Sequence, residues 1–417
     1  MCFVFLAFEG SGAVIRTVAA SIAIGVMLIA VARRLGLPAI VLLLAGGMLL
    51  GPAVLGDHAI VRPDALGDGL RVVVALAIGL VLFEGGLTLD LGGYRTAPAM
   101  IKRLLTIGVL VSWGGSAAFC AILGGIEPRF AMLAGAMVVV TGPTVIGPLL
   151  ERLDVDDRLR SIMHWESVLI DPIGVFIAVL CFEVVVSGLS GPVAAGSLLL
   201  RITAGLGLGT AGGLALTWAM RRRLIPGDML GIVSLATAML VFGLAEIIRP
   251  EAGLLATTVA GLVLAITRPR QVGRIRAFKG EITDLLVGLL FMLLSASLEL
   301  AQFAAFGWSG ALAVLGVMLV ARPAAVLLCS IGTGLSRNER IFLSWVAPRG
   351  IVAASLASLS AIAIEDRFEG TEGAETAAFV ETFVYAVIIA TIVGQGLTAG
   401  LLARLLGLQR EPRRRAG

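Results

Sequence analysis

Hydrophobic residues lie along this chain in long runs, separated by short segments that contain Arg, Lys, Asp, Glu, Pro and Gly. A transmembrane helix needs about 20 predominantly apolar residues, and most of the runs have about this length. They predict about thirteen membrane-spanning helices, over residues 13–32, 37–55, 70–90, 99–125, 129–150, 161–187, 193–220, 228–248, 252–267, 281–300, 307–333, 340–363 and 376–403.

The composition identifies the surroundings of these helices. The chain is 58% hydrophobic and 14% charged, against about 25% charged residues in soluble domains, and its mean hydropathy is +1.02. A soluble protein of this composition would have too few polar residues to cover its surface. We therefore predict an all-α polytopic membrane protein whose helices contact the lipid bilayer.

Other chemistry is sparse in the sequence. The four cysteines are scattered, and with only two histidines the chain has no spacing typical of a disulfide or a metal site. We expect no cofactor and no metal other than a transported cation. The basic run from Arg268 to Lys279 fits a loop beside anionic lipid, so a nucleic-acid partner is not expected.

Basic residues concentrate in alternate loops between the predicted spans. The opposite loops contain only Arg62, Arg71, Arg129, Arg249 and Arg367. Because cytoplasmic loops carry an excess of Lys and Arg, this bias places the N-terminus outside and the C-terminus in the cytoplasm. Four arginines fall within spans: Arg16 and Arg201 near outer ends, where they can reach the interface, and Arg322 and Arg349 deep inside, where they need buried partners.

The odd number of spans suggests an internal repeat. Two six-helix halves of opposite orientation, about residues 13–187 and 228–403, are expected to flank a connector helix at 193–220. This inverted-repeat plan occurs in many secondary transporters. Together the two halves and the connector are expected to form one transmembrane domain over residues 1–407, followed by a short basic tail at 408–417.

Proline interrupts corresponding spans of the two halves near their middles. The first carries Thr141-Gly142-Pro143, and the second carries Ala347-Pro348-Arg349-Gly350. Proline removes a backbone donor, and unwound backbone within a membrane is tolerated only inside protein or beside a wet cavity. The paired positions predict two broken helices that cross at a site. The alternative is two proline kinks that only shape the bundle.

An ion site is predicted in the sixth span. Ser167 and Asp171 are four residues apart and share a helix face, while Glu166 lies on a neighbouring face. Carboxylates within a membrane are costly and typically mark ion or proton pathways. Asp171 could hold a cation and a proton in turn. The alternative is that Arg322 and Arg349 neutralise both carboxylates as static ion pairs.

These residues together resemble a known family, the monovalent cation/proton antiporters of the sodium/proton exchanger type, and within it the bacterial NhaP-like branch. The resemblance extends over nearly the whole chain. The matching runs are Leu82 to Leu87, Thr141-Gly142-Pro143, Glu166 to Pro172, Leu290 to Leu294, Ala321-Arg322-Pro323 and Pro348-Arg349-Gly350.

The resemblance implies roles for the matching residues. Asp171 corresponds to the aspartate that binds ion and proton, with Ser167 and Thr141 as further ligands. Glu166 corresponds to the carboxylate that pairs with Arg322, and Arg349 to an arginine near the helix crossing.

Two positions depart from the family pattern. Gly142 stands where the family usually has an acid, and Ile170 stands where it usually has Asn. The site therefore has one carboxylate fewer and no neighbouring amide, so either Na⁺ or K⁺ is a possible substrate.

The resemblance also implies a function. We expect a secondary transporter, not an enzyme, that exchanges Na⁺ or K⁺ for H⁺ by alternating access. It is expected in the bacterial plasma (inner) membrane as a homodimer that contributes to pH homeostasis. Two other functions remain open: an uncoupled cation channel, and a membrane sensor derived from a transporter.

Overall fold

The computed structural model describes residues 2–35, 37, 39–89, 91–153, 155–267, 272–298, 300–368 and 370–409. Most of these residues form helices, and the strand-like pairing among them consists of two isolated antiparallel bridges. Every predicted span corresponds to one helix or to a run of consecutive helical segments. The tail beyond residue 409, and Arg268 and Arg270 of the basic loop, lie outside the described residues.

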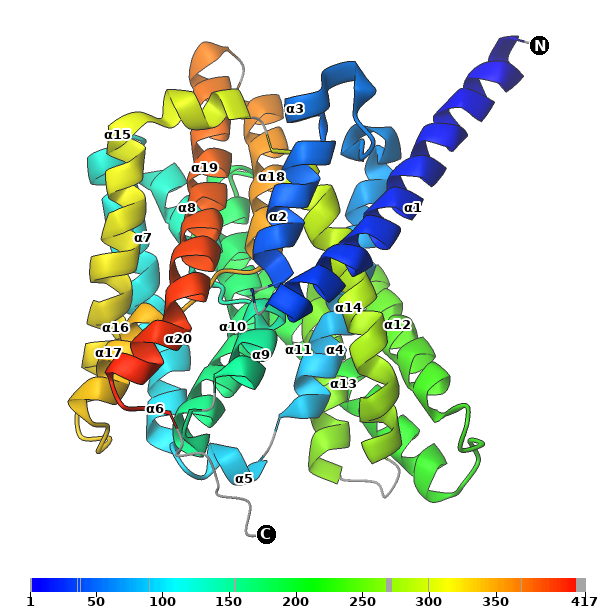
Figure 1. Cartoon of the computed structure of the whole chain (residues 1–417), viewed down its shortest axis with the longest axis vertical. Helices are drawn as coiled ribbons and strands as arrows, with labels where there is room; N and C mark the ends of the chain where they lie inside the picture. Colours follow the sequence, from blue (N-terminus) through cyan, green and yellow to red (C-terminus); the bar gives the residue numbers. More distant parts are fainter. Residues whose placement is uncertain are drawn as a thin grey trace. The chain divides into compact units, whose positions relative to one another are not determined.

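The helices have the following bounds: α1 (Cys2–Leu35), α2 (Ala39–Leu50), α3 (Pro52–Leu55), α4 (Asp68–Thr88), α5 (Leu91–Tyr94), α6 (Pro98–Arg103), α7 (Val109–Gly124), α8 (Pro128–Val139), α9 (Pro143–Arg152), α10 (Asp157–Val185), α11 (Gly191–Arg221), α12 (Leu230–Ile248), α13 (Ala252–Thr267), α14 (Val272–Ala296), α15 (Leu300–Gly316), α16 (Arg322–Cys329), α17 (Arg337–Trp345), α18 (Ile351–Arg367), α19 (Thr371–Ala390) and α20 (Gly396–Leu405). Figure 1 shows their course.

Five short segments have other helical geometry. Two are 3₁₀ turns, η1 (Gly56–His58) and η2 (Pro63–Leu66). Three are π-turns, η3 (Leu104–Gly108), η4 (Val317–Ala321) and η5 (Thr391–Gln395), and each joins two α-helices into one longer run. Such π-turns are often found at functional sites.

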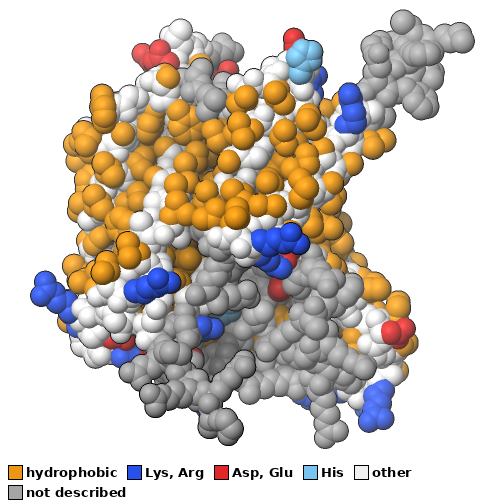
Figure 2. All heavy atoms as spheres, in the orientation of Figure 1, with side chains coloured by type: hydrophobic (Ala, Val, Ile, Leu, Met, Phe, Trp, Pro, Cys, Tyr) orange, Lys and Arg blue, Asp and Glu red, His pale blue; other side chains and the backbone are white. Residues whose placement is uncertain are grey.

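Nine helical segments in the described part of the chain are long and apolar enough to cross a membrane. Three further apolar helices are shorter: 128–139, 252–267 and 282–296. On the face drawn in Figure 2, hydrophobic side chains cover much of the surface of α15 and α19. The prediction of an all-α polytopic membrane protein is therefore confirmed.

The chain divides into two compact units, each built from two separate segments. Unit 1 comprises residues 1–88 and 204–301. Within it, α4 packs against α13, and α14 packs against α1 and α2. Glycines allow these approaches: a Cβ atom at Gly261 would lie 2.9 Å from the backbone nitrogen of Leu87, and one at Gly25 would lie 3.0 Å from the backbone of Gly288.

Unit 2 comprises residues 89–203 and 302–417 and contains both spans that proline interrupts. Within it, α8 packs against α7, α10 and α19, and α18 packs against α19. The helix starts have local causes: the Asp156 side chain accepts a hydrogen bond from the backbone of Arg158 at the start of α10. Ser336 and Glu339 form a capping box at the start of α17.

An arginine expected at the membrane interface is instead buried in unit 2. Arg201 and Glu183 form an ion pair of 2.7 Å, with both side chains 11% exposed. Ser197 donates a further hydrogen bond to the same carboxylate. The expectation that Arg201 reaches the interface was wrong, because its position near the span end did not reveal a carboxylate on the neighbouring helix.

Candidate functional site

The two proline-interrupted spans of unit 2 meet at their unwound segments. In the first span α8 ends at Val139 and α9 begins at Pro143, and in the second α17 ends at Trp345 and α18 begins at Ile351. Thr141 and Arg349 form an antiparallel bridge between the two segments. The Gly142 N–H donates to the Pro348 carbonyl at 3.3 Å. These are broken helices that cross, and not the simple proline kinks of the alternative interpretation.

The crossing requires a glycine on one side. A Cβ atom on Gly350 would lie 2.6 Å from the Cα atom of Gly142, closer than non-bonded carbon atoms approach. The φ angle of Gly350 is −112°, which any residue can adopt. Space alone therefore excludes a side chain, and the two backbones are in direct contact.

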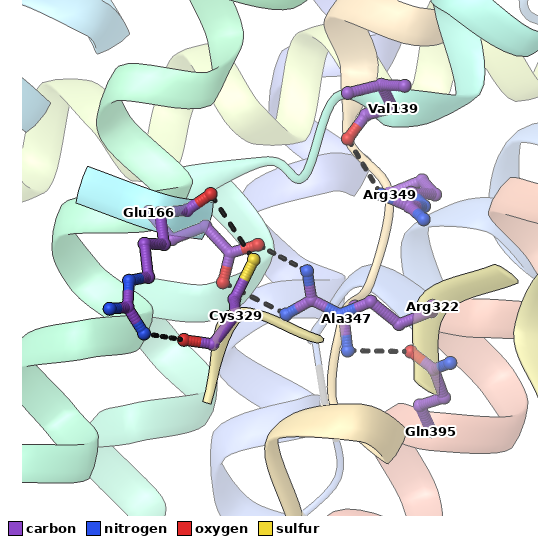
Figure 3. A network of polar contacts seen from close by, with 8 residues as sticks. Val139, Glu166, Arg322, Cys329, Ala347, Arg349 and Gln395 are labelled. Atoms are coloured by element: carbon purple, nitrogen blue, oxygen red, sulfur yellow. Dashed lines mark hydrogen bonds and ion pairs between the residues drawn. The ribbon is translucent and has the colours of Figure 1, made fainter. Parts of the chain in front are cut away.

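Arg349 replaces the hydrogen bond that Pro143 removes. In a continuous helix the Val139 carbonyl would accept from the backbone nitrogen of residue 143, which proline cannot provide. The Arg349 side chain, 3% exposed, donates from Nη1 to this carbonyl at 2.8 Å. Figure 3 shows the contact between the two unwound segments. The buried partner expected for Arg349 is therefore a backbone oxygen.

Asp171 lies in α10 and is 2% exposed. Among the described residues it has no ion pair, and its Oδ1 atom has no hydrogen-bond partner. The alternative in which Arg349 neutralises a carboxylate as a static pair does not apply, because that guanidinium bonds to Val139. A buried carboxyl group without a partner cation is costly and is suited to binding a cation or a proton.

Two buried hydroxyl groups belong to the first unwound segment and to α10. Thr141, in the first unwound segment, is 2% exposed, and its Oγ1 atom has no hydrogen-bond partner among the described residues. Ser167, one helical turn before Asp171, is 1% exposed and donates to the His164 carbonyl at 3.0 Å. The lone pairs of both hydroxyls remain available as ligands.

The face of α10 beside Asp171 packs on the first unwound segment. Ile170 lies in a buried cluster with Val139. Gly174, one turn further on the same face, packs directly on Val140, because a Cβ atom added at Gly174 would clash with Cγ2 of this valine. Ile170, one of the two departures from the family pattern, thus has a packing role here.

Glu166 and Arg322 form a bidentate ion pair. Arg322 Nη2 donates to Glu166 Oε2 at 2.9 Å, Nη1 donates to Oε1, and both side chains are 5% exposed. Arg322 follows the π-turn η4 at the start of α16. Figure 3 shows the pair at the crossing. The Glu166 carboxylate is therefore already occupied by a cationic partner.

Side chains from a further helix bind the second unwound segment. The backbone N–H of Ala347 donates to Gln395 Oε1 at 3.0 Å, and that of Arg349 donates to Thr391 Oγ1 at 3.1 Å. Both side chains belong to the π-turn η5. Our sequence analysis missed them. The available signal was two polar residues four positions apart in the middle of a predicted span.

The family model described as "Sodium/hydrogen exchanger, transmembrane" matches residues 19–405. The chain is 23% identical to probable Na⁺/H⁺ antiporter 2 of Methanocaldococcus jannaschii, over 80% of this chain and 81% of that protein. It is 25% identical to the K⁺/H⁺ antiporter NhaP2 of Shewanella sp. (strain MR-4), over 94% of this chain but 66% of that protein.

The fold also resembles a solved structure. The sodium proton antiporter MjNhaP1 of Methanocaldococcus jannaschii superposes with a TM-score of 0.82, over 97% of this chain and 100% of that chain, at 20% sequence identity. At this identity the likeness establishes the fold.

Proposed function

The chain belongs to the sodium/hydrogen exchanger family, and on that premise we propose that it exchanges a monovalent cation, Na⁺ or K⁺, for protons across a membrane. The observation that carries the proposal is the buried carboxyl group of Asp171, which has no ion pair among the described residues and lies in a helix packed on the unwound segment of Thr141. The relatives named above are antiporters for Na⁺ and for K⁺.

Coupling arises from competition at Asp171. The carboxylate can hold a cation with help from the oxygen atoms of Thr141 and Ser167, or it can hold a proton, but not both. If access to Asp171 alternates between the two sides of the membrane, each passage carries either a cation or a proton. Net exchange then follows without a requirement for ATP or any cofactor.

The charge balance favours one-for-one exchange. Glu166 is paired with Arg322, so its charge is compensated in both states of the site. Asp171 remains as the carboxyl group that changes its occupant. One cation therefore replaces one proton, and the exchange is electroneutral.

The identity of the cation depends on the ligand set. Gly142 provides no carboxylate beside Thr141, and Ile170 is engaged with Val139. Fewer charged ligands lower the demand for a small, strongly hydrated cation, so K⁺ is a substrate candidate beside Na⁺. Li⁺ serves as a third test cation.

The wider arrangement is proposed on the same premise. The protein is placed in the bacterial inner membrane as a homodimer, with its N-terminus outside and its C-terminus in the cytoplasm. This arrangement includes two inverted repeats, a connector and a tail, at about 13–187 and 228–403, at 193–220 and at 408–417.

Transport by purified protein in liposomes tests the proposed function. We expect that Na⁺ or K⁺, added outside vesicles with an acidic interior, dissipates the pH gradient in a saturable manner. The rate should not change when the membrane potential is clamped at different values. Empty liposomes are the control.

Two outcomes would favour the other functions. Cation flux that continues without proton movement would indicate an uncoupled channel. Absence of flux for Na⁺, K⁺ and Li⁺, with the folded protein still binding one of them, would favour a sensor.

A further inference from the structure

The second unwound segment depends on η5 for two of its backbone hydrogen bonds. Unwound backbone exposes N–H groups that an intact helix would satisfy internally, and leaving them unpaired within a membrane costs several kcal/mol. Gln395 Oε1 accepts from Ala347, and Thr391 Oγ1 accepts from Arg349. The two contacts flank Pro348, which has no N–H to pair.

Both side chains are built into their positions. Thr391 is 2% exposed and Gln395 is 1% exposed. The Thr391 hydroxyl donates its own hydrogen to the Ile388 carbonyl at 3.1 Å, so a lone pair is left to accept from Arg349. The π-turn η5 spans residues 391–395, with Thr391 at its start and Gln395 at its end.

A continuous chain of contacts leads from these two residues to the candidate cation ligand. The segment that they hold contains Pro348, whose carbonyl accepts from Gly142, and Arg349, which bridges to Thr141. Arg349 also donates to the Val139 carbonyl. Thr141 therefore lies between two attachment points, and both depend on the position of the second segment. Figure 3 shows the contacts of Gln395 and Arg349.

We propose that Thr391 and Gln395 are positioning residues for cation binding, which hold the second unwound segment so that the segment in turn fixes Thr141. The inference rests on the proposed function, because it assigns these residues to the same site. Neither side chain is required to touch the cation. The proposed role depends on the hydrogen-bond-accepting oxygen of each side chain and not on the volume of the side chain.

Matched substitutions separate the acceptor from the volume. Thr391→Val keeps the shape and removes the hydroxyl, whereas Thr391→Ser keeps the hydroxyl. Gln395→Met keeps a side chain of similar length and leaves only a weak sulfur acceptor. The control is Thr382→Val in α19, which removes the hydrogen bond from a buried threonine to Gln302 at 3.2 Å, away from the unwound segment.

The measurement is cation-driven proton movement in liposomes, with Na⁺ and K⁺ varied to obtain KM and maximal rate. We expect Thr391→Val and Gln395→Met to raise the KM about tenfold, the equivalent of about 1.4 kcal/mol, with the maximal rate within about twofold. Thr391→Ser and Thr382→Val should keep a KM within about threefold of wild type, a smaller change than the loss of one hydrogen bond at the site can produce.

The outcomes are distinguishable. Active wild-type protein with unchanged KM in Thr391→Val and Gln395→Met, or an equal rise in Thr382→Val, overturns the inference and leaves the proposed function intact. Wild-type protein that transports none of the cations overturns the proposed function and the inference with it. Size-exclusion chromatography in detergent checks folding, and Thr391→Ala replaces Thr391→Val if the latter does not fold.

Discussion

Replacing Asp171 with Asn is expected to reduce cation-driven proton movement to the level of empty liposomes. The amide keeps the shape of the side chain but can neither bear the charge that binds a cation nor take up the proton. Asp171 is 2% exposed and has no ion pair among the described residues, so its replacement breaks no charge pair. We expect the thermal stability in detergent to stay at or above that of wild type.

The control for this prediction is Asp366→Asn. Asp366 lies near the end of α18 and is exposed, so this variant removes one carboxylate from unit 2 without touching the crossing. It should transport like wild type. Near-normal exchange by the Asp171→Asn protein would remove this residue from the centre of the mechanism.

Removal of either partner of the Glu166–Arg322 pair is expected to destabilise the protein strongly. Both side chains are 5% exposed, and a charge left alone at a buried position typically costs about 3–5 kcal/mol. Glu166→Gln and Arg322→Gln should each lower the free energy of unfolding in detergent by this order. The double variant should lose less than the sum of the two, because it leaves no unpaired charge.

A surface pair provides the matched comparison. Glu127 and Arg129 form an ion pair of 2.5 Å, but their side chains are 59% and 50% exposed. Glu127→Gln, Arg129→Gln and the double variant should each change the free energy of unfolding by about 1 kcal/mol or less. Strictly additive losses at Glu166 and Arg322 would show that the two residues do not act as a pair.

The helices of this protein were predictable because lipid imposes a simple requirement. Each span must be long and apolar, so length and hydropathy alone locate it. The two breaks were predictable as well, because Pro143 and Pro348 remove backbone donors in the middle of such spans. The α1 helix begins at Cys2, well before the predicted span at residue 13.

The contacts of the site were less predictable. The partner of Arg349 is the Val139 carbonyl, and any residue type can supply a backbone acceptor. The roles of Thr391 and Gln395 depend on which helix packs beside the second unwound segment. The sequence does not specify the partner in either case, because both contacts depend on packing between segments far apart in the chain.

The burial of Glu183 with Arg201 shows the same limit. Both residues lie near span ends, where charged side chains ordinarily reach water. Only the packing of α10 beside the first turns of α11 brings them together. Position along a span therefore does not by itself predict whether a charged side chain is exposed.

The dependence of the cation KM on pH tests the central claim, competition of cation and proton for Asp171, most directly. Wild-type protein in liposomes is measured at a series of pH values, equal on both sides at the start, with the cation varied at each. Competition predicts that the KM rises as pH falls, approaching about tenfold per pH unit because the proton concentration changes tenfold, while the maximal rate at saturating cation does not fall as the pH is lowered. A KM that does not change with pH, together with a maximal rate that falls as the pH is lowered, would contradict the claim.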